Sequence, residues 1–285
     1  MKVLAFQQVD VFTAVPFKGN PVAVVLDGDA LSGEQMQSIA AWTNLSETTF
    51  VCTPTNQRAD YRLRIFTPRR ELPFAGHPTI GSAHAVLRRG FKPRTAGRLV
   101  QECGKGLVDI KIDGERLLLA LPEPQFREPT KSHLDAVADG LGVSGADVQR
   151  AAIIDVGPVW FTVQLVSGDA VRALAPDMGK LAALNSIGIT GVNVFGLYPQ
   201  ARAPTLKSAR LRQATVSLKI RCAAAVMGVW QRSSARMAFS ERARSYVASQ
   251  GCCVGREGLV AVEFHEDTIW LGGHAVTCIE GSLKI

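Results

Sequence analysis

Residues 66–82 read Phe66-Thr67-Pro68-Arg69-Arg70-Glu71-Leu72-Pro73-Phe74-Ala75-Gly76-His77-Pro78-Thr79-Ile80-Gly81-Ser82. This run predicts the end of a strand, a turn marked by glycine and proline, and the start of an apolar helix. The N-terminus of a helix carries backbone N–H groups without partners inside the helix and the positive end of the dipole, so it suits an anion. An imidazole there, His77, can also move a proton. The run is therefore typical of an active site rather than of a purely structural turn.

The first half of the chain surrounds this run with β-structure. Alternating apolar residues predict strands at residues 3–9, 22–26, 49–52, 61–66, 107–112 and 117–121. Ser32 followed three residues later by Gln35 has the spacing of a capping box, which predicts a helix over 32–43. A second helix is predicted from Pro78 through Leu87. It is apolar on nearly every side, as expected for a helix enclosed by other elements.

The second half repeats this plan after a linker marked by Pro122, Pro124 and Pro129. Strands are predicted within residues 153–166, split at Gly157-Pro158, then at 191–197 and between 259 and 285. We therefore predict two domains, at residues 1–121 and 130–285, with a last strand that can cross to the first domain.

The composition is that of a globular protein. An apolar fraction of 47% with 20% charged residues is enough for substantial cores. No stretch approaches the ~18 uninterrupted apolar residues of a membrane span, and the first residues predict a strand rather than a signal peptide. Six cysteines without a C-x-x-C pair indicate neither a disulfide framework nor a zinc site. We expect a cytoplasmic protein with no membrane partner and no bound metal.

The net charge of +7 is concentrated in one segment. Residues 201–245 hold ten Lys and Arg against one acid, which is 10 − 1 = +9 and leaves 7 − 9 = −2 for the rest. The charge argument for nucleic-acid binding therefore rests on this one segment, and the rest of the chain is mildly acidic. We therefore expect no nucleic-acid partner.

Two more groups can carry chemistry. Asn20 lies in the turn Gly19-Asn20-Pro21, and Glu47 lies among small hydroxyls and apolar residues in the run 44–50. Taken alone, Asn20 is more often part of a tight turn and Glu47 more often a solvated loop residue or helix cap, and His77 could equally be an inert, hydrogen-bonded ring. Together with the glycine turn they make a stronger signal.

The motifs that contain these residues identify a family. They are Asp10-x-Phe12, Pro16-Phe17-x-Gly19-Asn20-Pro21, Ser46-Glu47-Thr48-x-Phe50, Phe66-Thr67-Pro68 and the run from Glu71 to Thr79. The chain resembles the phenazine-biosynthesis-like (PhzF-like) isomerase family, which is similar in fold to diaminopimelate epimerase. The match is specific over residues 1–90 and looser over 91–200 and 246–285.

The resemblance implies an α+β fold of two similar domains, each a β-barrel wrapped around a central helix, with the active site in the cleft between them. It implies a cofactor-independent proton shift on a small carboxylated metabolite, with Glu47 as general acid/base and Asn20, Gly76, His77 and Thr79 binding the substrate. The residue types suit this chemistry, because a desolvated carboxylate is a stronger base and a helix N-terminus stabilises developing negative charge. A two-thiol racemase is disfavoured, since Gly76-His77 occupies the stretch where a thiol would be needed.

One segment departs from the family pattern. A second motif of the type Glu-Asp-Pro-x-x-Gly-Ser should fall near residue 220, where Ile220 stands in place of an aspartate. Reading the codons one nucleotide back permits Glu-Asp-Pro-Val-Cys-Gly-Ser across this stretch. Our hypothesis is that about residues 205–240 are out of frame, and the alternative is a segment that has diverged. An intact second motif would favour the isomerase.

The sequence leaves a second function class open. A non-catalytic relative that binds a ligand or partner in the same cleft is favoured if the second motif is truly absent, whereas intact Glu47 and His77 favour the enzyme. Oligomeric state is not readable from the chain, although a homodimer is the commonest oligomer.

Overall fold

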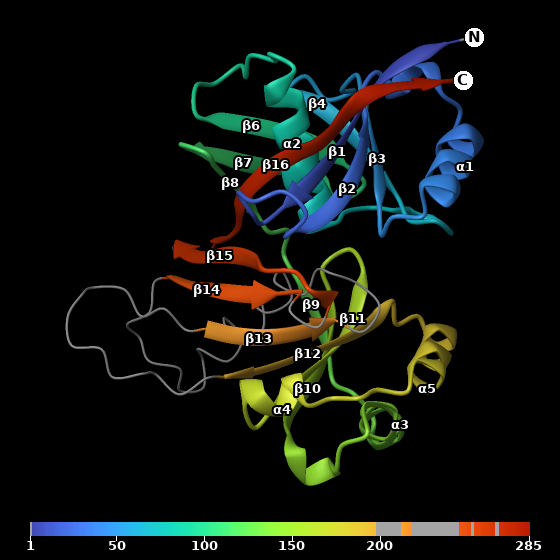
Figure 1. Ribbon diagram of the computed structural model, residues 1–285, viewed down its shortest axis with the longest axis vertical. Coiled ribbons are helices and arrows are strands. Elements are labelled where there is room, and N and C mark those ends of the chain that lie inside the picture. Colours follow the sequence, from blue (N-terminus) through green and yellow to red (C-terminus); the bar gives the residue numbers. More distant parts are fainter. Residues whose placement is uncertain (1, 198–211, 218–244, 252–253, 266–267) are drawn as a thin grey trace, which may run out of the picture. The chain divides into compact units, whose positions relative to one another are not determined.

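The computed structural model describes residues 2–197, 212–217, 245–251, 254–265 and 268–285 (Figure 1). The chain divides into two compact units. Unit 1 comprises residues 1–122 together with 270–285, and unit 2 comprises residues 123–269. The end of the chain therefore belongs with its beginning. The fold class is confirmed as mixed α+β, and each unit is described by itself.

Unit 1 is a closed barrel. Its eight described strands follow the order β1-β2-β3-β4-β6-β7-β8-β16, and β16 pairs again with β1 to close the ring. Their bounds are β1 Val3–Val11, β2 Asn20–Val25, β3 Thr48–Cys52, β4 Tyr61–Phe66, β6 Arg98–Cys103, β7 Gly106–Asp113, β8 Arg116–Ala120 and β16 Thr268–Lys284. The short strand β5 (Glu71–Leu72) pairs with β4 outside the ring.

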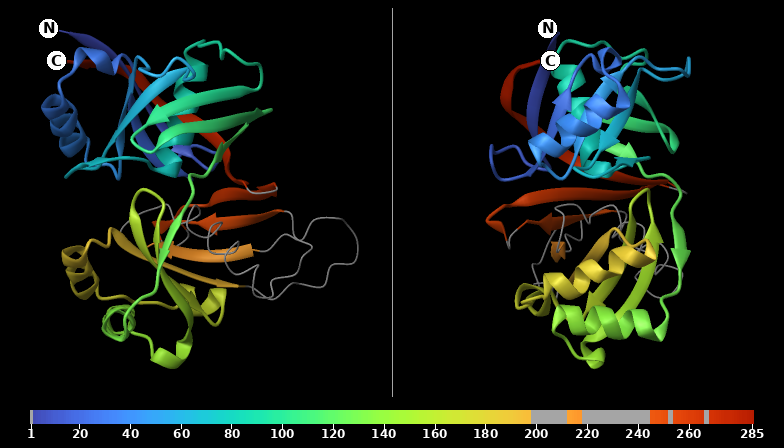
Figure 2. Two further views of the ribbon diagram at one scale, coloured as in Figure 1. Left: turned by 180° about the vertical axis from the view of Figure 1, so that it is seen from behind. Right: turned by 90° about the vertical axis from the view of Figure 1, so that its right-hand side faces the viewer.

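Helix α2 (Gly76–Arg88) fills this barrel. It contacts β1, β2, β3, β4 and β8, and all its residues from Gly76 to Ala83 are buried (Figures 1 and 2). Its approach to the wall is close at Gly81, where a Cβ atom would lie 2.4 Å from Cγ1 of Val22. The predicted enclosed helix is therefore the central helix of a barrel.

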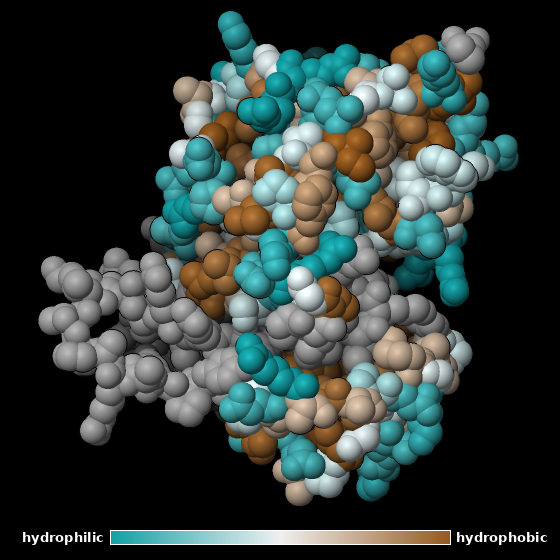
Figure 3. Space-filling model, in the orientation of Figure 1, coloured by the Kyte–Doolittle hydropathy of each residue, from teal (hydrophilic) through white to brown (hydrophobic). Residues whose placement is uncertain are grey.

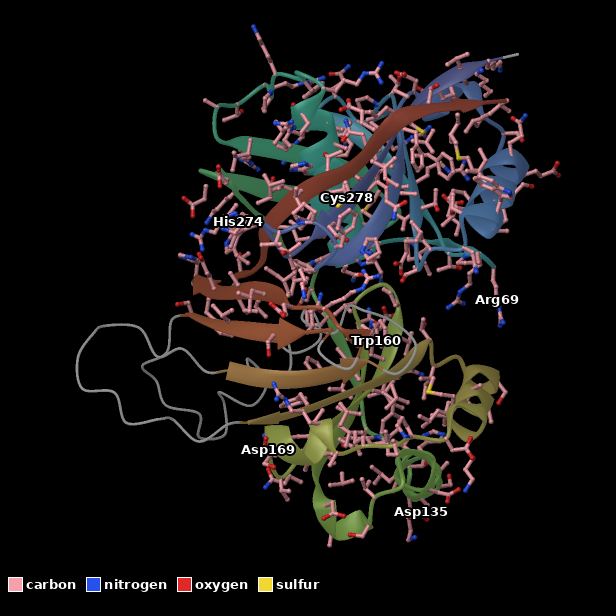
Figure 4. All side chains as sticks on the ribbon, viewed as in Figure 1. Arg69, Asp135, Trp160, Asp169, His274 and Cys278 are labelled. Atoms are coloured by element: carbon pink, nitrogen blue, oxygen red, sulfur yellow. The ribbon has the colours of Figure 1, made fainter. Side chains whose placement is uncertain are left out.

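The ring closes at the seam between β1 and β16. The register shifts between Gln8, opposite Ile279, and Val9, opposite Thr277, so Cys278 is a bulged residue on β16 (Figure 4). His84 of α2 reaches this seam, with Nε2 3.0 Å from the Thr277 hydroxyl. Burial lowers the pKa of His84 to about 4. The seam thus fastens the central helix to the last strand.

Helix α1 (Gly33–Thr43) packs on the outside of the ring and begins as predicted. Ser32 and Gln35 form a reciprocal capping box, at 3.2 Å and 2.9 Å. Met36 and Ala40 face a buried cluster with Phe50 and Phe66 of β3 and β4.

The visible surface of unit 1 is largely hydrophilic, with hydrophobic residues scattered over it (Figure 3).

Unit 2 follows the same strand order. Its sheet runs β15-β14-β13-β12-β11-β10-β9, with bounds β9 Gln125–Arg127, β10 Val148–Asp155, β11 Val159–Leu165, β12 Gly191–Leu197, β13 Arg212–Ser217, β14 Ser245–Gln250 and β15 Gly258–His265. Helices α3 (Lys131–Leu141), α4 (Gly168–Arg172) and α5 (Met178–Ala182) supply Val137, Val171 and Leu181 to an aliphatic core with β10, β11 and β12.

The pairing types show that the two units share one plan. The strands β1, β2, β3, β4, β6 and β7 alternate antiparallel and parallel in the same sequence as β10 to β15. In unit 1 the connection between the fourth and next strand contains α2. The corresponding connection, residues 218–244, lies outside the described residues, as does most of the segment with the frame hypothesis, so that hypothesis stays a prediction. Only Arg212–Ser217 of it is described, as β13.

No helix in the described ranges is long and apolar enough to cross a membrane.

Candidate active site

Glu47 is held in a short loop between α1 and β3. Asn44 ends α1 in the left-handed conformation with φ 52°, which turns the chain toward β3. The hydroxyls of Thr43 and Thr48 lie 2.7 Å apart and brace the loop from both sides. Only 4% of Glu47 is exposed. The sequence favoured a solvated loop position for this residue when taken alone, and the structure buries it instead.

His77 faces Glu47. It is the second residue of α2, it is 1% exposed, and its Nε2 atom lies 3.4 Å from Oε2 of Glu47. The two groups form an ion pair when the imidazole is protonated. Residues thirty positions apart thus become a buried acid–base pair, because β3 lies beside the first turn of the central helix.

The N-terminus of α2 has no side-chain cap. Ala75 occupies the N-cap position and offers no side-chain acceptor, and Pro78 contributes no N–H group. The backbone N–H groups of Gly76 and His77 point toward this end of the helix, and the dipole adds partial positive charge. This end of the barrel interior is suited to a carboxylate or to developing negative charge.

Thr79 is built into the wall of the same turn. Its hydroxyl donates to the Ala75 carbonyl at 2.9 Å and accepts from the Gln101 amide at 3.0 Å. The Tyr61 hydroxyl in turn donates to Gln101 at 3.0 Å, and burial raises the pKa of this phenol. The chain of bonds anchors the first turn of α2 to β4 and β6. The Thr79 hydroxyl therefore has two protein partners already. Its predicted role in substrate binding stays a prediction.

Asn20 begins β2 and is 1% exposed. The preceding Gly19 is required by a close approach, because a Cβ atom there would lie 2.5 Å from the Val11 carbonyl oxygen. The Gly19 N–H donates to the buried carboxylate of Asp10 at 3.1 Å. Asp10 therefore fixes the turn that delivers Asn20 into the barrel.

The turn before α2 is braced at its outer side. Arg64 of β4 donates two hydrogen bonds to Glu71 of β5, at 2.8 Å and 2.7 Å. The Arg69 side chain at the tip of this turn points away from the barrel (Figure 4). Both arginines of the quoted run, Arg69 and Arg70, are exposed, whereas the run is buried from Phe74 to its end at Ser82.

All five predicted site residues lie in unit 1, and Glu47, Gly76 and His77 come together at one end of the central helix. Sequence reasoning missed the supporting residues Tyr61 and Gln101, which the pairing of β4 with β6 brings together. Among the described residues, no three His, Cys, Asp or Glu side chains are arranged to hold a metal ion.

Comparison with known proteins places this site in a family. The family model described as phenazine biosynthesis-like protein matches residues 9–281. The chain belongs to this family. The predicted resemblance is therefore confirmed, and the match includes every residue of the candidate site.

Two relatives are similar to this chain, and one of them carries an isomerase name. The chain is 41% identical over 187 residues to trans-2,3-dihydro-3-hydroxyanthranilate isomerase of Pseudomonas aeruginosa, covering 64% of each chain. It is 38% identical over 292 residues to antisense-enhancing sequence 1 of Schizosaccharomyces pombe, covering 97% of each. The predicted enzyme class, an isomerase, is confirmed at the level of the family.

Solved structures confirm the fold. The phenazine biosynthesis protein of Bacillus anthracis, PhzF family, aligns with a TM-score of 0.79 at 24% identity and covers 100% of both chains. At this identity the likeness concerns the fold alone, and it supports the α+β architecture predicted from the sequence.

Proposed function

We propose that this isomerase moves a proton between carbon atoms of a small carboxylated metabolite, with Glu47 as the general acid/base and no cofactor. The observation that carries the proposal is the buried pair of Glu47 and His77, 3.4 Å apart beside the uncapped N-terminus of α2. A carboxylate held out of water is a stronger base than one in solution.

The reaction has two balanced steps. The Glu47 carboxylate takes a proton from a substrate carbon, and the electron pair left behind is delocalised into the unsaturated or carboxyl group of the substrate. The N–H groups of Gly76 and His77 stabilise the negative charge that develops there. The protonated Glu47 then returns the proton to another carbon of the substrate. Asn20 orients the substrate from β2.

Proton exchange with solvent tests this proposal directly. The purified protein is incubated in D2O with trans-2,3-dihydro-3-hydroxyanthranilate, the compound in the name of the Pseudomonas aeruginosa relative, and with a panel of small unsaturated or α-substituted carboxylic acids. We expect deuterium at a carbon of the product, followed by mass spectrometry. The variant Glu47→Gln should lose about 100-fold or more of the rate, the usual contribution of a general base.

The exposed Glu34 in the first turn of α1 offers a matched control. Glu34→Gln should exchange at the wild-type rate. A Glu47→Gln variant that keeps its rate contradicts the assignment of the base. Binding of an acid by the wild-type protein without any exchange would favour the non-catalytic relative.

Two further expectations stay predictions. A homodimer is checked by light scattering of the purified protein, and a cytoplasmic location by fractionation of the source cells.

A further inference from the structure

Three elements of unit 1 carry the candidate site residues, and one hydroxyl touches all three. Asn20 begins β2, Glu47 directly precedes β3, and His77 lies on α2. The hydroxyl of Thr49, the second residue of β3, lies 3.2 Å from the Ala23 carbonyl oxygen of β2 and 2.8 Å from the Ser82 hydroxyl of α2.

The direction of these hydrogen bonds follows from the single proton that each hydroxyl carries. Thr49 donates to the Ala23 carbonyl, which can only accept. Ser82 is therefore the donor to Thr49. Both side chains are fully buried, so water cannot replace either bond.

The junction lies close to the acid–base pair. Thr49 is two residues beyond Glu47, or about 7 Å along a strand, and Ser82 is five residues beyond His77, or about 7.5 Å along a helix. Gly81 lets α2 approach β2 at this level, because any Cβ there would meet Val22. The hydrogen bond between Thr49 and Ser82 thus ties β3 to α2 about 7 Å from Glu47 and from His77.

We propose that Thr49 and Ser82 are positioning residues that set the spacing between Glu47 and His77. They act through the two elements and not by touching the substrate. The inference rests on the proposed function, because it gives the pair Glu47 and His77 the catalytic role.

The His77 ring reports this spacing without any substrate. The sequence contains five histidines, and the variant His77→Gln identifies the His77 signal in a nitrogen–proton NMR spectrum by its loss. A lengthening of the Glu47–His77 distance by about 1 Å weakens their Coulomb interaction by about a fifth. We expect Ser82→Ala and Thr49→Val to move the titration midpoint of His77 by about half a pH unit.

Kinetics give the second readout. Misplacing the base lowers kcat more than it weakens binding, so kcat should fall about tenfold in both variants while KM changes little. The conservative variant Thr49→Ser keeps both hydrogen bonds and should restore the His77 midpoint and kcat.

Matched controls separate positioning from packing. Thr162→Val makes the same exchange at a buried strand position of unit 2, and Ser38→Ala removes an exposed helix hydroxyl that donates to the Glu34 carbonyl at 2.9 Å. Neither should alter the His77 signal. Thermal unfolding shows which variants fold, and Ser82→Ala decides the question if Thr49→Val does not fold.

Unchanged His77 titration and kcat in both Ser82→Ala and Thr49→Val would overturn the inference, and so would an equal change in the Thr162→Val control. If Glu47→Gln stays active, the proposed function fails, whereas the His77 signal still measures the spacing by itself.

Discussion

The two units build the same strand plan and place different residues at the position of the candidate site in unit 1. In each, a helical connection joins two parallel strands, β2 to β3 through α1 and β11 to β12 through α4 and α5. With the buried Phe50 aligned to the buried Phe195, Glu47 corresponds to Val192. The shared strands therefore make the barrel wall, and the residue before Thr48 is a buried carboxylate in unit 1 and an aliphatic side chain in unit 2.

The polar interiors of the units differ in the same way. Unit 1 buries Glu47, His77, Asp10 and Asp60, whereas no described residue of unit 2 is both charged and buried. The buried hydroxyls Thr49 and Ser82 of unit 1 are hydrogen-bonded to each other. In unit 2, Thr162 and Asn193 lie opposite each other on β11 and β12, and neither side chain has a hydrogen-bond partner among the described groups. The hydroxyl of Thr49 is thus held by two hydrogen bonds, whereas that of Thr162 has none among the described groups.

The strongest test of this contrast changes the corresponding residues Glu47 and Val192. Glu47→Gln should abolish most activity, by about 100-fold, and leave the fold intact. Val192→Ala should do the opposite, lowering the free energy of unfolding by about 2 kcal/mol through the cavity it leaves in the aliphatic core, with activity per folded molecule retained. Steady-state rates and urea unfolding of both variants check the pair. A large loss of activity in folded Val192→Ala would contradict the division of roles.

A glycine in each unit compares how tightly their helices pack. Gly81→Ala should lower the free energy of unfolding by about 2 kcal/mol, because its Cβ would lie 2.4 Å from the buried, stiff Val22 side chain. Gly140→Ala in α3 meets Cδ2 and Cγ of Leu181 at 2.6 Å and 2.9 Å, a side chain that is less stiff than valine, and the gain of about 1 kcal/mol in helix propensity applies to both variants. Thermal unfolding should therefore show a large shift for the first variant and a small one for the second.

Two buried threonines compare a hydroxyl that makes hydrogen bonds, in unit 1, with one that has no partner among the described residues, in unit 2. Thr49→Val removes two buried hydrogen bonds and should destabilise the protein by about 1–2 kcal/mol. Thr162→Val removes a buried hydroxyl with no described partner and should be neutral or stabilising by up to about 1 kcal/mol. Denaturant midpoints measured side by side decide the matter. Equal destabilisation would mean that the Thr162 hydroxyl has a partner after all.

An effect that depends on pH is expected at the seam of unit 1. The pKa of His84 is about 4 in the folded protein, below the usual value of about 6.5, so the unfolded chain binds more protons between these values. Stability from this group is complete above about pH 6.5 and is lost as pH falls toward 4. His84→Gln should flatten the dependence of the unfolding free energy on pH in that window.

Local signals in the sequence predicted much of the fold. The capping box placed α1, and Gly157-Pro158 separated β10 from β11. Strand β6 was missed because the buried Gln101 interrupts its apolar alternation, and α3 was missed because its cap pairs Thr130 with His133 rather than with an acid or amide. The site was predicted where motifs are contiguous, at Glu47 and at Gly76-His77. Its supports join β3, β4 and β6 to α2, and no local pattern encodes such pairs.

The frame hypothesis needs a measurement on the molecule itself. An intact mass that fits the shifted frame over about residues 205–240 would restore the second motif around Ile220. A mass that fits the sequence as given would mean that the segment has diverged.

The pairing of β1 with β16 has a consequence for biosynthesis. Residues 3–11 complete their ring only with residues 275–284, so the first strand leaves the ribosome long before its partner is made. All of unit 2 is translated in between. Until then one edge of β1 is open to strands of other nascent chains. We therefore expect unit 1, which carries the candidate site, to reach its final form only after translation of the chain has passed residue 284.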